Sequence, residues 1–120
     1  MRLRPTDRAI ALVEEFRKVD PEMQLQTVWF FLLAAKYEPC SQNYLTKLSG
    51  YTRTTVSRNM AILSEIGGRG RTGHDLVAQQ IDPEDRRSRL ITLTPKGRAI
   101  YRSVQFIIGG DNEAATDEET

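Results

Sequence analysis

The stretch that decides the fold is Asp82-Pro-Glu-Asp-Arg-Arg-Ser-Arg-Leu-Ile-Thr-Leu-Thr-Pro-Lys-Gly97. Residues 76–81 before it and residues 90–93 within it are rich in apolar and β-branched side chains, which is typical of strands. Between them, Pro83 presets φ, and the aspartates around it can bond to nearby backbone amides. The sequence therefore predicts an antiparallel hairpin with a turn over residues 82–87 and a strongly basic tip.

A helix is expected directly after this hairpin. Thr94 is a suitable N-cap, and Pro95 fits the first helical turn, where its missing N–H is no loss. The glycines at 109 and 110 are expected to end the helix. Its apolar stripe has helical spacing and consists of Ile100, Val104, Ile107 and Ile108.

Upstream of the hairpin, the sequence predicts a helix, a tight turn and a second helix. Ser41 is expected to cap the first helix, which runs to Leu48, and Gly50 supplies the backbone freedom for the turn. The side chains expected to face inward from the first helix are Tyr44, Leu45 and Leu48.

The second of these helices, expected over residues 52–66, has two chemically different faces. This division fits helix-turn-helix recognition, in which apolar side chains hold the helix on the core while polar ones reach base edges and phosphates. An ordinary amphipathic helix shows the same division, and it is the basic hairpin behind the helix that predicts a wing. The expected buried residues are Val56, Met60, Leu63 and Ile66, and the expected outer residues are Arg53, Thr54, Ser57, Arg58 and Asn59.

Two further helices are expected at the N-terminus. Thr6 or Asp7 is expected to cap the first, which ends before Pro21. The second covers residues 22–37 and is apolar on nearly all sides, so it is either the hub of the core or part of a subunit interface. The predicted fold class is mainly α with a small antiparallel β-hairpin, an α+β winged helix-turn-helix.

The composition fits one globular domain. The chain has 120 residues, of which 39% are hydrophobic and 28% charged, and this argues against general disorder. We expect a single domain over residues 1–110 and a disordered acidic tail over residues 111–120. No apolar stretch approaches the roughly 20 residues that cross a bilayer, no signal peptide is seen, and Cys40 has no second cysteine to pair with. A cytoplasmic protein is therefore expected.

The charge is distributed unevenly along the chain. The net charge is +1, but five of the sixteen acidic residues lie in the last ten positions, and basic residues predominate between Lys47 and Arg102. A polyanion-binding surface requires such a local excess. A solvated basic face fits the charge equally well, so charge alone leaves both alternatives open.

The order helix, helix, helix-turn-helix, hairpin, helix resembles the MarR family of winged-helix transcriptional regulators. The family's wing has an Asp-x-Arg pair, a strand that ends in Leu-Thr and a glycine in the next helix. Upstream, the run Thr54-Thr55-Val56-Ser57-Arg58 is similar to the family's helix-turn-helix signature, and the resemblance covers roughly residues 20–108. The wing positions are taken here by Asp85, Arg87, Leu93, Thr94 and Gly97.

The resemblance implies that Arg87 enters the minor groove of duplex DNA, where a narrow A·T-rich groove attracts a guanidinium. Asp85 would orient an arginine rather than contact DNA, or act as a turn former. The implied wing residues are Asp85, Arg86, Arg87 and Arg89, and the implied major-groove residues are Arg53, Thr54, Thr55, Ser57, Arg58 and Asn59. The implied phosphate contacts are Ser41, Lys47, Arg69 and Arg71, although the glycine-rich loop that carries the last two can also be a simple connection.

The resemblance further implies a homodimer that binds a palindromic operator in double-stranded DNA and acts as a repressor. In the family, long C-terminal helices interlock with the partner's N-terminal helix, and here residues 95–108 are available for that contact. The alternative is a winged-helix protein-interaction or architectural module whose basic face is incidental. The sequence identifies no small-molecule effector.

No catalytic, metal or cofactor site is expected. His74 is the single histidine, and the acidic residues are too scattered to complete a zinc site with it. Cys40 is expected to be a small buried hydrophobe rather than a redox switch. The glycine-rich loop over residues 67–73 lacks the Lys-Ser/Thr ending of a phosphate-binding loop, so an enzyme is not expected.

Overall fold

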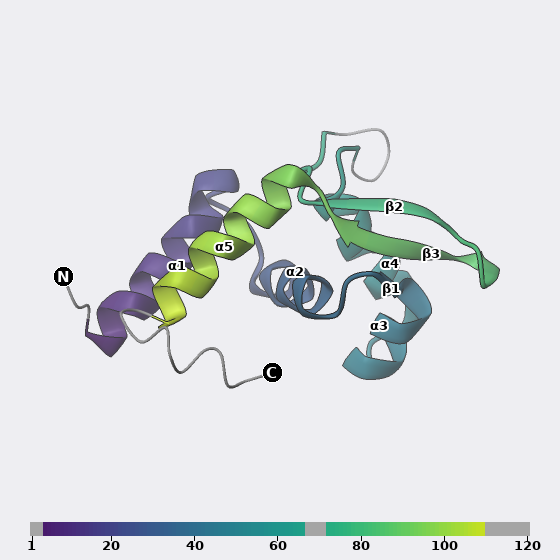
Figure 1. Cartoon of the computed structure of the whole chain (residues 1–120), viewed down its shortest axis with the longest axis horizontal. Coiled ribbons are helices and arrows are strands. Elements are labelled where there is room, and N and C mark those ends of the chain that lie inside the picture. Colours follow the sequence, from purple (N-terminus) through teal and green to yellow (C-terminus); the bar gives the residue numbers. More distant parts are fainter. Residues whose placement is uncertain (1–3, 67–71, 110–120) are drawn as a thin grey trace. The chain divides into compact units, whose positions relative to one another are not determined.

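The computed structural model describes residues 4–66 and 72–109, and over these residues it contains five α-helices and one three-stranded antiparallel sheet (Figure 1). The predicted fold class is therefore confirmed. The acidic tail and most of the glycine-rich loop lie outside the described residues.

The chain divides into two compact units. One is the segment Gln24–Arg98, which holds the helix-turn-helix and the whole sheet. The other combines the N-terminal residues as far as Met23 with the C-terminal residues from Ala99 onward. Everything described below as a site lies in the first unit.

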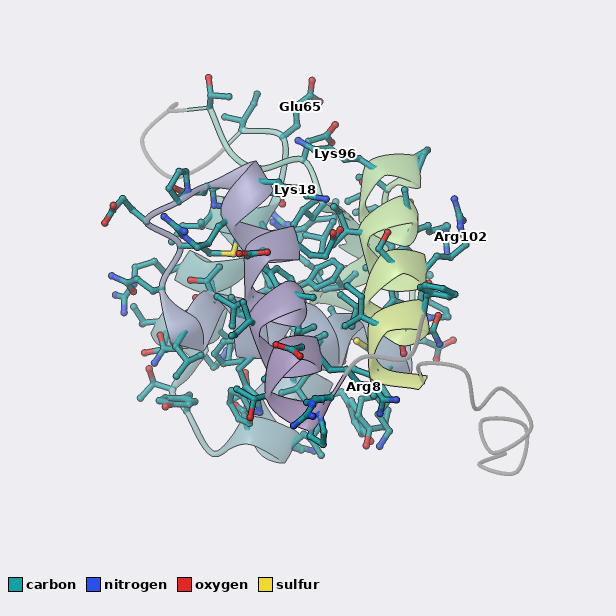
Figure 2. The ribbon with its side chains drawn as sticks, turned by 90° about the vertical axis from the view of Figure 1, so that its left-hand side faces the viewer. Arg8, Lys18, Glu65, Lys96 and Arg102 are labelled. Atoms are coloured by element: carbon teal, nitrogen blue, oxygen red, sulfur yellow. The ribbon has the colours of Figure 1, made fainter. Side chains whose placement is uncertain are left out.

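The N-terminal helix α1 spans Pro5–Val19. The expectation that Thr6 or Asp7 caps it is wrong, because the helix begins at Pro5, whose fixed φ suits the first helical position. Asp7 instead lies in the first turn, where a negative charge interacts favourably with the helix dipole. Figure 2 shows Arg8 and Lys18 toward opposite ends of α1, and Lys18 pairs with Glu15 at 2.7 Å.

Helix α2 spans Leu25–Tyr37, three residues shorter at its start than predicted. One side is packed and includes Phe30 and Phe31, which are fully buried. The opposite side is open, since Leu25 is 83% exposed and Trp29 is 40% exposed. Burial on all sides, as its composition suggested, is therefore not observed.

The helix-turn-helix consists of α3, Gln42–Ser49, and α4, Arg53–Leu63. From the inner side of α3, Leu45 is buried, whereas Tyr44 and Leu48 are partly exposed, contrary to expectation. Helix α4 ends before Ile66, which is largely exposed rather than buried. The core of this unit contains the fully buried side chains of Phe30, Phe31, Leu45, Val56, Met60, Leu63, Leu76 and Ile91.

The sheet has the strand order β1-β3-β2, with β2 spanning Val77–Asp82 and β3 spanning Asp85–Leu93. The predicted turn over residues 82–87 is too long, because pairing continues to Asp82 and Asp85 and leaves Pro83 and Glu84 between the strands. The strand β1, Cys40–Ser41, was not predicted, and it pairs with β3 at Ile91 and Leu90. It ties the start of α3 to the base of the wing.

Helix α5 spans Pro95–Gly109 and begins with the predicted cap. The Thr94 hydroxyl accepts from the Gly97 N–H at 2.9 Å and donates to the Asp75 carbonyl at 2.7 Å. Farther along, Val104 is buried, and Figure 2 shows Arg102 projecting outward from the helix. No helix in the described residues is both long and apolar enough to span a bilayer.

Candidate nucleic-acid interface

Three side-chain and backbone signals set the geometry of the helix-turn-helix. The Ser41 hydroxyl caps α3 by accepting from Tyr44 N at 2.9 Å, and the Thr52 hydroxyl caps α4 by accepting from Thr55 N at 3.1 Å. Between the helices, Gly50 adopts φ +78°, a left-handed conformation that favours glycine. Each of these residues acts on its near neighbours in sequence, so the helix-turn-helix can be predicted from the sequence alone.

Helix α4 presents a polar face to solvent. Arg53, Thr54, Ser57 and Arg58 are exposed, as expected from the sequence. Thr55 is half-buried, and its hydroxyl lies 3.1 Å from that of Thr52, so it belongs to the capping end of the helix. The hydroxyl and guanidinium groups on the outer face are the types that pair with base edges and phosphates.

Asn59 is not part of that face, and its placement there was wrong. Its side chain is 2% exposed and lies between α4 and α2. Asn59 Oδ1 accepts from Thr27 Oγ1 at 2.8 Å, while Asn59 Nδ2 donates to Gln26 Oε1 and to the Thr55 carbonyl, each at 3.0 Å. Because these bonds engage both ends of the amide, Asn59 anchors α4 on α2 instead of facing outward.

The wing carries its arginines on the open part of the hairpin. Arg86, Arg87 and Arg89 are exposed. Asp85 contacts Arg87. Asp85 Oδ1 accepts from Arg87 N at 3.1 Å and lies 3.5 Å from Arg87 Nε. The backbone hydrogen bond from Arg87, followed by the positive charges of Arg87 and Arg53, holds the pKa of Asp85 below its usual range.

An open groove of about 670 Å³ lies between the helix-turn-helix and the wing. Four arginines line it, and none of its described lining residues is acidic. The groove therefore brings the outer face of α4 and the wing arginines together on one positive surface. Its lining comprises Gln42, Asn43, Thr46, Arg53, Thr54, Ser57, Arg58, Ala61, Gln79, Arg87, Ser88 and Arg89.

The same fold occurs in solved structures of known regulators. A MarR transcriptional regulator from Methanosarcina mazei superposes with a TM-score of 0.65 at 18% identity, over 91% of this chain and 71% of that one. The MepR–DNA complex of S. aureus gives 0.67 at 16% identity, over 95% of this chain and 83% of the other. A MarR-like regulator from Thermotoga maritima gives 0.61 at 17% identity, over 97% and 83%. This chain has the MarR-type winged-helix fold. No protein-family model matches its sequence, and no curated protein matches it either.

Within this MarR-type fold, the residues expected to contact phosphates differ in exposure and in hydrogen bonding. Lys47 is exposed near the end of α3. Ser41 is half-buried, and its hydroxyl is engaged in capping α3. Arg69 and Arg71 lie outside the described residues.

Sequence reasoning missed several polar residues of the groove. Gln42 and Asn43 open α3, and Gln79 comes from β2. Gln42 Nε2 donates to Gln79 Oε1, and Gln79 Nε2 donates to Ser64 Oγ at 2.9 Å, so these amides link α3 through β2 to the residue after α4. The one local signal was that Gln42 and Asn43 directly follow the cap Ser41, whereas their contacts with β2 and the wing depend on the fold.

Proposed function

We propose that this protein binds double-stranded DNA sequence-specifically and regulates transcription. The observation that carries the proposal is the shared groove, because Arg53 and Arg58 of α4 open onto the same surface as Arg87 of the wing. Duplex DNA is the polyanion whose two adjacent grooves suit a polar helix beside a basic hairpin. The S. aureus MepR structure, a complex with DNA, supports the assignment.

The two elements would divide the work of recognition. The exposed face of α4, centred on Ser57 and Arg58, would lie in the major groove, where each base pair has a distinct pattern of donors and acceptors. The wing would follow the backbone so that Arg87 enters the neighbouring minor groove. Lys47 would contact phosphate, which requires charge more than exact geometry.

We further propose a cytoplasmic homodimer that acts as a repressor at a palindromic operator. Exposed apolar side chains support self-association: Ile10 and Val13 on α1, and Phe106 and Ile108 on α5, are each more than half exposed. A twofold dimer would present two wings and two α4 helices, so its operator would have matching half-sites. Sedimentation of the purified protein at micromolar concentration tests the dimer, and a purely monomeric species would refute it.

The test of the function is selection from a random duplex library at moderate salt, followed by sequencing of the retained DNA. The expected result is a palindrome with half-sites about one helical turn apart. Failure to enrich any sequence, with weak binding that salt abolishes, would overturn the proposal and favour the protein-interaction or architectural module. Arg87→Ala checks the wing, and it should weaken binding and reduce the log–log salt slope by about 0.9 if one phosphate-equivalent contact is lost.

A further inference from the structure

The outer part of the wing receives little support from the sheet. Strand β1 pairs with β3 at Leu90 and Ile91, so in the described structure residues 82–89 belong to a two-stranded ribbon (Figure 1). A two-stranded hairpin is only marginally stable by itself. The position of Arg87 relative to α4 therefore depends on whatever else holds this ribbon.

Asn43, in the first turn of α3, contacts the ribbon twice. Its backbone N–H donates to Ser88 Oγ at 3.4 Å, and its side-chain Nδ2 donates to Asp85 Oδ2 at 3.1 Å. Ser88 is a buried residue of β3, so the first contact is partly shielded from water. Within the described residues, both hydrogen bonds that join α3 to the outer wing come from Asn43.

Asp85 connects Asn43 to the wing arginine. One carboxylate oxygen accepts from Asn43, and the other accepts from Arg87 N and lies 3.5 Å from Arg87 Nε. With both oxygens engaged by different elements, the plane of the carboxylate is fixed from two sides. The Arg87 side chain is itself 89% exposed, so this carboxylate, not packing, restricts its direction.

The charge of Asp85 determines which end of the Asn43 amide faces it. Asp85 is ionised at neutral pH, as an aspartate whose pKa is lowered from its ordinary value of 3.8 must be, and an ionised carboxylate is solely an acceptor. Asn43 must therefore present its NH₂ group, as the 3.1 Å contact shows. A side chain of the same size without a donor would not replace it.

We propose that Asn43 is a positioning residue for DNA binding, which ties the wing to α3 through Asp85 and thereby sets the place of Arg87 beside the recognition helix. The inference rests on the proposed function. It assigns no contact with DNA to Asn43. Its effect on binding must pass through Arg87.

A double-mutant cycle tests this dependence. The probe is a labelled duplex of about 30 base pairs that carries the site enriched from the random library, at constant low salt. Asn43→Ala should weaken binding about three- to tenfold, the size of one typical net hydrogen bond. In an Arg87→Ala background the same change should alter affinity less than about twofold, because the group that Asn43 positions is gone.

Two variants separate positioning from a general structural role. Asn43→Asp keeps the size but replaces the donor with a second carboxylate beside Asp85, so it should bind at least as weakly as Asn43→Ala. Gln42→Ala is the matched control, because the neighbouring amide bonds to Gln79 and not to Asp85. Its effect on affinity should be the same with and without Arg87.

The outcomes distinguish the inference from the function beneath it. If the wild-type protein enriches no site from the random library, the proposed function fails. If the wild type binds and Arg87→Ala weakens it, but Asn43→Ala and Asn43→Asp bind normally, the function stands and the positioning role is refuted. Equal losses from Asn43→Ala in both backgrounds also refute it, since they would show an effect that does not pass through Arg87.

Discussion

Thr27 on α2 and Asn59 on α4 are joined by a buried hydrogen bond of 2.8 Å between Thr27 Oγ1 and Asn59 Oδ1. A second bond, from Asn59 Nδ2 to Gln26, also joins α4 to α2 and helps to fix the rotation of α4 about its axis. With the amide held inward, Ser57 and Arg58 face out. A polar pair in the core thus orients the outer face of α4, which is proposed to contact bases.

The first prediction concerns the stability cost of losing this pair. Asn59→Ala should lower the free energy of unfolding by about 2–4 kcal/mol, because it leaves the Thr27 hydroxyl without its acceptor and opens a small cavity. Urea denaturation followed by circular dichroism measures the change. Ser57→Ala, on the exposed face of the same helix, should change stability by less than about 0.5 kcal/mol. Equal stability of the two variants would mean that the Asn59 side chain is not held in the core.

The misplacement of Asn59 shows where sequence reasoning reached its limit. Asn59 comes three residues after Val56 and four before Leu63, so helical spacing already puts it on the buried face. Its polarity suggested the opposite, since a buried amide is acceptable only with partners. Those partners, Gln26 and Thr27, lie more than thirty positions away in sequence, and only the fold brings them together.

The elements that were predictable depend on neighbours in sequence. Ser41, Gly50, Thr52 and Thr94 act within a few residues, and each lies at the helix end or turn where the structure needs it. The strand at Cys40–Ser41 gave no such signal, because a two-residue strand exists only through its pairing with β3. The groove residues contributed by α3 and β2 were missed for the same reason.

The second prediction concerns the glycine in the first turn of α5. A Cβ at Gly97 would lie 2.0 Å from the carbonyl oxygen of Leu76, the residue before β2. The first turn of α5 could then no longer approach Leu76 as closely as it does now. Gly97→Ala should therefore destabilise the protein by about 1–3 kcal/mol, as overpacking does. Thermal unfolding provides the measurement. Lys96→Ala, at the adjacent exposed position, is the control and should cost less than about 0.5 kcal/mol. A fully stable Gly97→Ala variant would refute the close approach.

The third prediction concerns the thiol of Cys40. Burial, with the nearby negative charge of Glu38, raises the pKa of Cys40 to about 11. At pH 8 the folded protein should react with iodoacetamide about a hundredfold more slowly than the urea-unfolded chain, because so little thiolate is present. Mass spectrometry of timed samples gives both rates. Equal rates in folded and unfolded protein would contradict a buried, protonated thiol.

The raised pKa also fixes the sign of a pH effect on stability. Below the ordinary thiol pKa of 9.0, Cys40 is protonated in both states and contributes no pH dependence. Between about 9 and 11 the unfolded chain loses this proton first, so the free energy of unfolding falls as pH rises. Wild type should therefore lose more stability than Cys40→Ala over this interval in parallel urea titrations. A steeper loss in the alanine variant would reverse the predicted sign.

The last prediction separates reading of bases from attraction to phosphate. Arg58 lies on the outer face of α4 and lines the groove, whereas Lys47 is exposed on α3 and does not line it. Arg58→Ala should weaken binding to the selected duplex by about 1–3 kcal/mol and relax the preference for bases at one position of each half-site. Lys47→Ala should weaken binding to all duplexes alike and lower the salt slope by about 0.9, since a phosphate contact has no base preference. Repeating the duplex selection with each variant at two salt concentrations distinguishes the two kinds of contact. An unchanged base preference for Arg58→Ala would remove this arginine from the reading face and leave specificity to Thr54 and Ser57.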